Sequence, residues 1–191
     1  MPSPFSALLL AAGRSTRMGC DKALLEIDGV PLWSRQRDTL ARAGAAEILL
    51  SARPEQKWVQ HTSGFSALLH DEQPNCGPII GVTAGLERAV HPHLAVLAID
   101  LPRVDAAWFQ SLLADCAPDV GVVGRRGEFF VPLAAIYPRE VKWLAWETIA
   151  RGDFSLQHFL AAAVAQGFMR VREISAADAV RFENWNEPPC A

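Results

Sequence analysis

A short apolar run near the start of the chain stops abruptly at small residues. Residues 7–10 read Ala-Leu-Leu-Leu, which has the length and composition of a buried parallel strand. Ala-Ala-Gly follows at 11–13, and a polar, basic stretch continues to residue 22. This change of pattern predicts a buried strand that ends in an exposed loop.

Beyond that loop, apolar runs alternate with segments of helical spacing. Runs at 47–51, 65–69 and 94–99 predict further strands. Pro31 stands where a helix commonly begins, and Gly44 stands where one commonly ends. The strand–helix–strand order predicts a right-handed βαβ unit, with the loop at the carboxyl end of the first strand. Open α/β sheets bind their ligands at that end.

The second half of the chain predicts a hairpin, three helices and a last strand. Because a hairpin joins antiparallel strands, the sheet should be mixed. Pro132 indicates an edge or a bulge, and we interpret Trp143 and Trp146 as packing residues. Asp105 and Ser155 are the expected helix caps. The expected helices span 106–116, 139–149 and 155–165, and the expected strands span 119–124, 129–136 and 168–174.

The predicted fold class is therefore α/β. It is a three-layer α/β/α sandwich around a Rossmann-like, mostly parallel mixed sheet, in a single domain over residues 1–191. With 191 residues and 50% apolar composition, the chain can bury one sizeable core, whereas two full domains would be cramped.

Charge and cysteine usage narrow the function classes. The net charge of −3 gives nucleic-acid binding no support. No apolar run approaches the ~20 residues that span a bilayer, and the first strand starts too early for a signal peptide. The four cysteines are scattered without a C-x-x-C pair, which favours free thiols in a reducing compartment. We expect a cytoplasmic protein without a membrane or nucleic-acid partner.

Residues 11–22 have the features of an anion-binding loop. Ala11, Ala12 and Gly13 are too small to shield their backbone amides, and glycine tolerates positive φ. Arg17 and Lys22 supply positive charge. The spacing matches neither a P-loop nor the G-x-G-x-x-G fingerprint. The alternative interpretation is a basic surface loop.

Two aspartates follow predicted strands at the same edge of the sheet. Asp100 ends the most apolar strand, where an unpaired buried carboxylate would be costly. At the mouth of a crevice it could stay ionised and bind Mg²⁺, which takes one or two carboxylates together with substrate phosphates. Asp71 should face the same crevice. The alternative for both is a turn or helix cap, although Asp105 is better placed than Asp100 to cap the next helix.

Residues 10–22, LAAGRSTRMGCDK, resemble the signature loop of nucleotidyltransferases that activate sugars, isoprenoid precursors or molybdopterin. The segments at 77–81, 100–102, 152–160 and 184–188 are similar to those of the molybdenum cofactor guanylyltransferase family. Two departures stand out. Ser51-Ala52-Arg53 replaces an asparagine-containing run, and Ala-Ala-Gly at 11–13 is the form that cytidylyltransferase relatives favour.

The resemblance implies the fold of nucleotide-diphospho-sugar transferases and transfer of GMP from GTP to the terminal phosphate of molybdenum-molybdopterin, with release of pyrophosphate. Arg17, Lys22 and Asp100 would be catalytic, and Mg²⁺ would be held by Asp100 and Asn186. The nucleotide and its metal would contact Leu10, Ala11, Ala12, Gly13, Lys22, Ser51, Asp71 and Asp100.

Two alternatives stay open at this point. One is cytidylyl transfer to molybdopterin, or nucleotidyl transfer to another phosphorylated acceptor. The other is a non-catalytic nucleotide-binding accessory protein. Other enzymes of molybdenum cofactor biosynthesis, or enzymes that accept the cofactor, are the expected protein partners.

Overall fold

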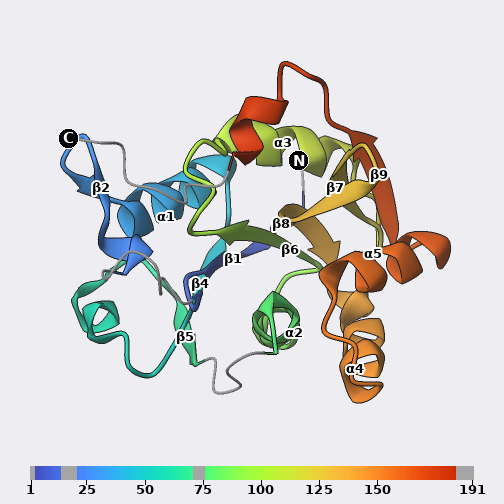
Figure 1. Ribbon diagram of the computed structural model, residues 1–191, viewed down its shortest axis with the longest axis horizontal. Coiled ribbons are helices and arrows are strands. Elements are labelled where there is room, and N and C mark those ends of the chain that lie inside the picture. The colour runs from blue at the N-terminus through green and yellow to red at the C-terminus, as the bar shows by residue number, and fades with distance from the viewer. Residues whose placement is uncertain (1–2, 14–20, 71–75, 184–191) are drawn as a thin grey trace.

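A seven-stranded mixed sheet forms the centre of the molecule (Figure 1). The computed structural model describes residues 3–13, 21–70 and 76–183. The strand order is β5-β4-β1-β6-β8-β7-β9, and within the sheet only β8 runs antiparallel to its two neighbours. The strands are β1 (Ser6–Leu10), β4 (Glu47–Ala52), β5 (Ala67–His70), β6 (His93–Ala98), β7 (Gly121–Arg126), β8 (Phe129–Pro138) and β9 (Met169–Glu173).

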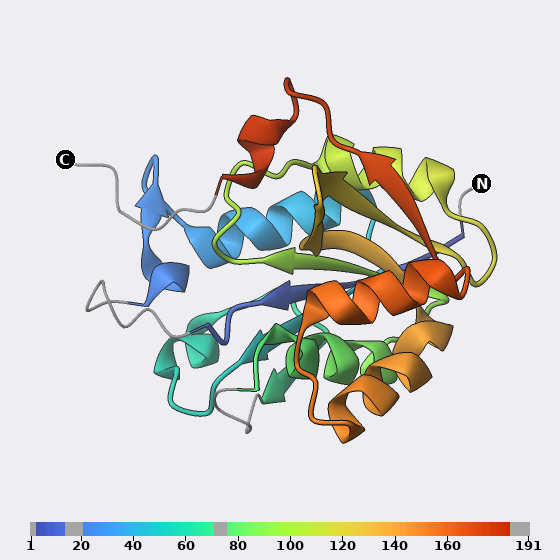
Figure 2. The ribbon, with the colours of Figure 1, turned by 45° about the vertical axis from the view of Figure 1, so that its right-hand side comes forward.

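Helices cover both faces of this sheet (Figure 2). Helices α1 (Leu32–Ala43) and α3 (Ala106–Asp115) pack on one face with their own apolar cluster. The other face carries α2 (Pro78–Arg88), α4 (Lys142–Ala150) and α5 (Leu156–Ala165). The three-layer sandwich and the mixed sheet predicted from the pattern are confirmed.

A two-stranded ribbon and four 3₁₀ helices are the remaining elements of the described part of the chain. They are the ribbon of β2 (Glu26–Ile27) and β3 (Val30–Pro31), and the 3₁₀ helices η1 (Lys22–Leu24), η2 (Lys57–His61), η3 (Arg139–Val141) and η4 (Ala179–Phe182).

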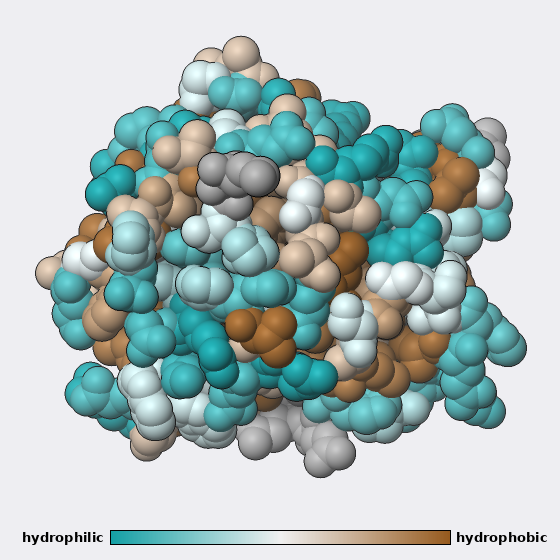
Figure 3. Space-filling view, turned by 180° about the vertical axis from the view of Figure 1, so that it is seen from behind, coloured by the Kyte–Doolittle hydropathy of each residue, from teal (hydrophilic) through white to brown (hydrophobic). Residues whose placement is uncertain are grey.

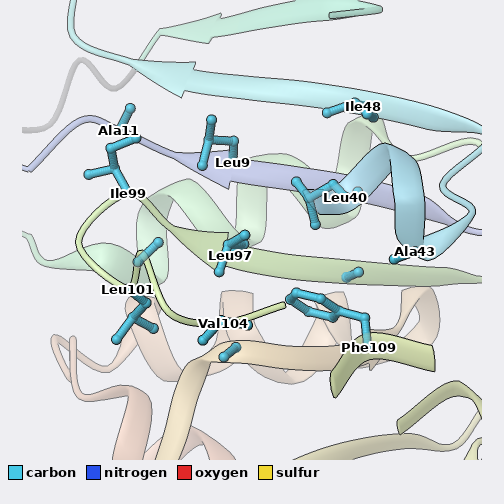
Figure 4. Packing of buried hydrophobic residues seen from close by; sticks show 14 of the residues in the cluster. Leu9, Ala11, Leu40, Ala43, Ile48, Leu97, Ile99, Leu101, Val104 and Phe109 are labelled. Atoms are coloured by element: carbon cyan, nitrogen blue, oxygen red, sulfur yellow. The ribbon is translucent and has the colours of Figure 1, made fainter. Parts of the chain in front are cut away.

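The two faces of the sheet explain why β1 is apolar throughout. All five of its residues are buried, because alternate side chains enter opposite clusters. Leu9 packs with Leu40 of α1 and Phe109 of α3 (Figure 4), whereas Leu8 packs with the helices of the other face.

Helix α2 approaches β1 unusually closely because two of its residues are glycines. A Cβ built on Gly81 would lie 2.5 Å from Leu10 Cδ2, and one built on Gly85 would lie 2.6 Å from Leu8 Cδ2. Real Cβ contacts are not this short, so a larger residue at either position would displace the buried leucine side chain or push α2 away from the sheet. These two glycines therefore allow α2 to pack directly against β1.

The structure confirms the predicted caps of three helices. Gly44 ends α1 with φ 100°, a left-handed conformation that suits glycine. Asp105 accepts a hydrogen bond from Trp108 N at 2.9 Å, and Ser155 accepts one from His158 N at 3.3 Å.

The hairpin differs in detail from the sequence prediction. The predicted strand 119–124 ends too early, because β7 continues to Arg126 and β8 resumes at Phe129. Gly127, with φ 60°, allows this two-residue connection. Between Val122 and Gly124 the register with β8 shifts, which is the bulge that Pro132 indicated; β8 itself lies inside the sheet.

The interpretation of Trp143 and Trp146 as packing residues is wrong. Their exposed fractions are 67% and 44%, because the buried stripe of α4 consists of Leu144, Ala145 and Thr148. Because each residue turns about 100° around the helix, the two tryptophans lie together on the face opposite that stripe.

The surface seen from behind mixes hydrophilic and hydrophobic side chains (Figure 3). Among the helices in the described part of the chain, none is both long and apolar enough to cross a membrane.

Candidate functional site

Three neighbouring parallel strands end at the same edge of the sheet and bring the predicted site together. In the register, Leu10 of β1 lies between Ser51 of β4 and Ala98 of β6. The ladder continues one residue further on each side, because Ala11 N donates to Ser51 O at 2.8 Å and Ile99 N donates to Leu10 O at 3.0 Å. Residues 11–13, the residues after β4 and the residues after β6 therefore emerge side by side.

The two chemically strongest predictions from the sequence meet here. Lys22 Nζ lies 3.8 Å from Asp100 Oδ2, and the side chains are 19% and 31% exposed. Lys22 begins η1, directly after its N-cap Asp21, while Asp100 follows β6. The structure thus places a cation and a carboxylate from distant parts of the sequence on one accessible spot.

A buried amide connects the two ends of the anion loop. Gln56, which is 4% exposed, donates from Nε2 to Ala11 O at 3.0 Å and to Asp21 Oδ2 at 2.5 Å. Trp58 Nε1 also donates to Asp21 Oδ2 at 2.8 Å. Asp21 in turn caps η1 through Ala23 N at 3.1 Å. The carboxylate of Asp21 therefore holds Lys22 in place and is itself held by η2 and the turn before it.

Arg53 braces the loop from the side of β4. Its Nη1 donates to Ala12 O at 2.5 Å and to Gly13 O at 2.6 Å. Carbonyl and N–H point in opposite directions across a planar trans peptide. Because Gln56 and Arg53 hold the carbonyls of Ala11 and Ala12, the N–H groups of Ala12 and Gly13 point away from these braces, and no described residue accepts from them. Two adjacent amide donors at the sheet edge where Lys22 meets Asp100 form a site suited to an anion.

A second buried amide supports the turn that carries Asp100. Gln36 of α1 is 1% exposed, and its Nε2 donates to Ala98 O at 3.3 Å and Leu101 O at 2.8 Å. These carbonyls lie on either side of Asp100 in the sequence. Gln36 therefore fixes the turn without touching the carboxylate.

Sequence reasoning missed these supporting residues. In the sequence, Arg53 stands out only as a departure from the family. Its position directly after β4 is the signal that could have placed a cation at the carboxyl edge of the sheet. Gln36, Gln56 and Trp58 carry no signal in the pattern, because their partners come from other elements.

The other described residues that were predicted to contact the ligand differ in their exposure. Gly13 is exposed, and a Cβ built on it meets no described atom within 4 Å. Gly13 is not one of the glycines with positive φ, so the expected use of positive φ at this residue is wrong. The small size of Gly13 leaves open space beside its backbone instead. Leu10 and Ser51 are 8% and 1% exposed. Their contact with nucleotide stays a prediction.

Arg17, Asp71 and Asn186 lie outside the described residues, so their roles stay predictions. Within residues 3–13, 21–70 and 76–183, no group of three His, Cys, Asp or Glu side chains could hold a metal ion. The carboxylate of Asp100 is 31% exposed, which suits a cation such as Mg²⁺ that binds through few protein carboxylates and completes its shell with phosphate and water.

Shifted pKa values arise away from this edge. Burial raises the pKa of the Cys116 thiol to about 11, so it stays protonated at neutral pH and offers no nucleophile. A hydrogen bond from Ser155 N and one with His158 lower the pKa of Asp153. Neither group takes part in the site.

A cleft of about 490 Å³ adjoins Asp100. It lies between the turn after β6, the β7–β8 hairpin and η4. The described residues that line it are Asp100, Leu101, Arg126, Phe129, Phe130, Val131, Pro132, Leu133 and Phe182. No sequence signal marked the hairpin as part of the site.

Solved structures with this fold include a molybdopterin-guanine dinucleotide biosynthesis protein A from Archaeoglobus fulgidus (TM-score 0.72, 18% identity, 96% of this chain and 93% of that one). A 2-C-methyl-D-erythritol 4-phosphate cytidylyltransferase from Thermus thermophilus gives 0.71, with 18% identity and coverage of 97% and 94%. A Mycobacterium tuberculosis protein in complex with manganese gives 0.61, with 20% identity and coverage of 91% and 88%.

The chain is a nucleotidyltransferase, the class to which its family and its full-length relatives belong. The chain belongs to the family of MobA-like NTP transferase domains, whose model matches residues 7–173. A relative from Opitutus terrae named "Probable molybdenum cofactor guanylyltransferase" is 39% identical over 97% of this chain and 92% of its own length. A molybdenum cofactor guanylyltransferase from Pseudomonas putida is 32% identical over 97% and 94%.

Proposed function

We propose that this nucleotidyltransferase transfers GMP from GTP to the terminal phosphate of molybdenum-molybdopterin and releases pyrophosphate. The observation that carries the proposal is the pairing of Lys22 with Asp100 beside the amides of Ala12 and Gly13. The names of full-length relatives supply the nucleotide and the acceptor.

The reaction needs alignment and charge neutralisation more than covalent help from the protein. An oxygen of the acceptor phosphate attacks the α-phosphorus of GTP, and the bond from that phosphorus to the bridging oxygen breaks, so that pyrophosphate leaves. Ala12 and Gly13 donate their amides to the nucleotide phosphates, and Lys22 stabilises the charge that develops on them. No protein nucleophile is required.

Mg²⁺ is the cofactor that we propose for Asp100. When bound, it would supply positive charge that offsets the negative charge of the reacting phosphates. Asp100 is accessible enough to hold it, and Gln36 keeps the supporting turn fixed while the phosphates bind. Asn186 remains the proposed second ligand, Asp71 the proposed nucleoside contact, and Arg17 the proposed second cation on the phosphates.

Cytidylyl transfer to molybdopterin is the second candidate, because Ala-Ala-Gly stands at 11–13. The same small residues leave room for a purine, so we favour guanine. The departure from the family at Ser51-Ala52-Arg53 favours a nucleotide-binding accessory protein without turnover. The contacts of Arg53 with Ala12 O and Gly13 O give that residue a use in an active loop.

A panel of four nucleoside triphosphates, each with and without molybdenum-molybdopterin, tests the proposal through pyrophosphate release. Guanylyl transfer predicts release only with GTP and acceptor together. A sugar phosphate serves as the acceptor control. Retained GTP binding without any release in the presence of authentic acceptor would instead identify an accessory protein. The proposed location is the cytoplasm, in line with the scattered cysteines, and proposed protein partners are other enzymes of cofactor synthesis or use.

A further inference from the structure

The four consecutive backbone carbonyls of residues 10–13 are all hydrogen-bonded inside the protein. Ile99 N and Gln56 Nε2 donate to the first two of them, each at 3.0 Å. Arg53 Nη1 donates to the last two, at 2.5 and 2.6 Å. The N–H groups of residues 12 and 13 have no acceptor among the described residues. Towards a ligand, this segment therefore presents hydrogen-bond donors, while its carbonyls are already engaged.

Arg53 and Gln56 belong to one closed turn. Gln56 N donates to Arg53 O at 3.1 Å, and Gln56 Oε1 accepts from Arg53 N at 2.6 Å. Pro54 is the second residue of this turn, a position that its fixed φ favours. Gln56 Nε2 also donates to Asp21, which caps η1 in front of Lys22. One short turn therefore holds both the segment that carries the free amides and the support of the Lys22 cation.

The side chain of Arg53 decides which way the peptide between Ala12 and Gly13 faces. The carbonyl and the N–H of a trans peptide point in opposite directions. Because the guanidinium binds Ala12 O, the N–H of Gly13 points away from Arg53. A rotated peptide would turn its carbonyl oxygen towards the phosphates, and the two negative ends would repel each other. Donors that are oriented before the ligand binds cost no reorganisation when charge develops.

The chemistry of arginine suits this task. A single planar NH2 group of the guanidinium reaches both carbonyls with its two hydrogens, and the side chain keeps its charge at neutral pH. The side chain of Arg53 is 23% exposed, so these contacts are largely shielded from water. Its ion pair with Glu55 is long, at 3.9 Å, and Glu55 is 79% exposed, so this pair competes little with the carbonyls.

We propose that Arg53 is a positioning residue for nucleotidyl transfer. It orients the amides of Ala12 and Gly13 towards the phosphates of the nucleotide, so that its contribution goes to the phosphates and not to the base. This proposal rests on the proposed function and deepens it by naming the side chain that prepares the phosphate-binding segment before GTP arrives.

Equilibrium binding of GTP, pyrophosphate and guanosine to the full chain in the presence of Mg²⁺ tests this role. Pyrophosphate carries phosphates without a base, and guanosine carries the base without phosphates. We expect Arg53→Ala to weaken the binding of GTP and of pyrophosphate about tenfold each, the scale of a lost hydrogen bond with a charged group. The affinity for guanosine should stay at the wild-type value. In steady-state kinetics, the KM for GTP should rise while the KM for molybdenum-molybdopterin stays constant.

A second variant, Arg53→Lys, separates positioning from charge. The lysine ammonium keeps the positive charge but lacks the planar group that reaches both carbonyls, so most of the loss should remain. The matched control is Arg37→Ala. The side chain of Arg37 is 20% exposed, and its Nη1 also donates to a backbone carbonyl, Ser63 O at 2.9 Å, outside the site. We expect wild-type affinity of the control for all three ligands.

Unchanged affinity of Arg53→Ala for GTP and pyrophosphate would overturn the proposal. An equal loss of guanosine affinity would also overturn it, because the side chain would then act on the base or on the fold as a whole. Full recovery in Arg53→Lys would reject positioning, since charge alone would suffice. If the alanine variant does not fold, Arg53→Lys carries the same three binding measurements. Failure of the proposed function would instead appear as wild-type protein that releases no pyrophosphate, and the binding measurements do not depend on that release.

Discussion

Lys22 and Asp100 place opposite charges 3.8 Å apart at an accessible point of the sheet edge. Each charge is useful only because other groups hold it there: Asp21 caps the short helix that begins with Lys22, and Gln36 fixes the turn beside Asp100. Residue-scale predictions should therefore separate the charge of each side chain from its contribution to the fold.

Replacing Lys22 by alanine should lower kcat/KM with little effect on folding. One charge-stabilising group in a transition state is typically worth ~10²–10³ in rate. Thermal unfolding and steady-state kinetics on the same preparation provide the measurement. Turnover within about threefold of wild type would remove Lys22 from the phosphate site, judged on that scale.

Asp100→Asn should preserve the fold and abolish activation by magnesium, because the amide keeps the shape of the side chain but not its charge. The carboxylate is 31% exposed, so its replacement leaves no buried unpaired charge. Activity titrated against Mg²⁺, together with thermal unfolding without nucleotide, checks this. A variant that unfolds outright, or one that is still fully activated, would indicate a structural aspartate.

At the scale of elements, two buried glutamines make similar hydrogen bonds but support different parts of the site. Gln56 joins Ala11 to Asp21 across the anion loop, whereas Gln36 holds the turn around Asp100. Both are almost fully buried and both donate from Nε2 to backbone carbonyls. A comparison of the two therefore distinguishes loss of loop geometry from general loss of stability.

We expect Gln56→Leu and Gln36→Leu to destabilise the fold by a similar amount, about 1–3 kcal/mol for buried acceptors left unpaired. Their kinetic effects should differ. Gln56→Leu should raise the KM for GTP, and Gln36→Leu should raise the Mg²⁺ concentration needed for half-maximal activity. Denaturant unfolding and the two titrations test this; identical kinetic changes in both variants would contradict separate positioning roles.

At the scale of elements, the sequence predicted features that depend on neighbouring residues and missed those that depend on distant ones. The helix caps and buried strands were predicted because their signals are local: Gly44, Asp105 and Ser155 act on neighbouring residues. The exposure of Trp143 was not predicted, because a tryptophan beside an apolar stripe reads like a member of it. The contacts of Arg53 and Gln56 were not predicted, since each pairs with a carbonyl about 40 positions away.

At the scale of the whole molecule, the strand order assembles the site. The ends of β4, β1 and β6 lie in adjacent places in the sheet although they are far apart in the chain. The sequence predicted that ligands bind at the carboxyl ends of the strands. The residue pattern predicted the anion-binding role of Lys22 and the metal-binding role of Asp100, and the resemblance implied the same roles. The cleft under the hairpin could not be predicted, because it depends on how β7, β8 and η4 approach Asp100.

The choice of nucleotide is a property of the whole pocket, because a site built to pair with one base leaves buried polar groups unpaired with another. Such rejection can reach ~10⁴ in specificity. We expect Ala12→Gly to change the preference between GTP and CTP only modestly, since both residues leave the space open. Relative kcat/KM values for the two nucleotides with this variant and wild type check that expectation.

Competition between GTP and CTP for one pool of molybdenum-molybdopterin, with the dinucleotide product analysed by mass spectrometry, tests the central claim most directly. The account predicts a guanine dinucleotide and a kcat/KM ratio of at least ~10² in favour of GTP, a cautious fraction of the attainable discrimination. A cytosine dinucleotide as the main product, or no dinucleotide at all from active wild-type preparations, would contradict it.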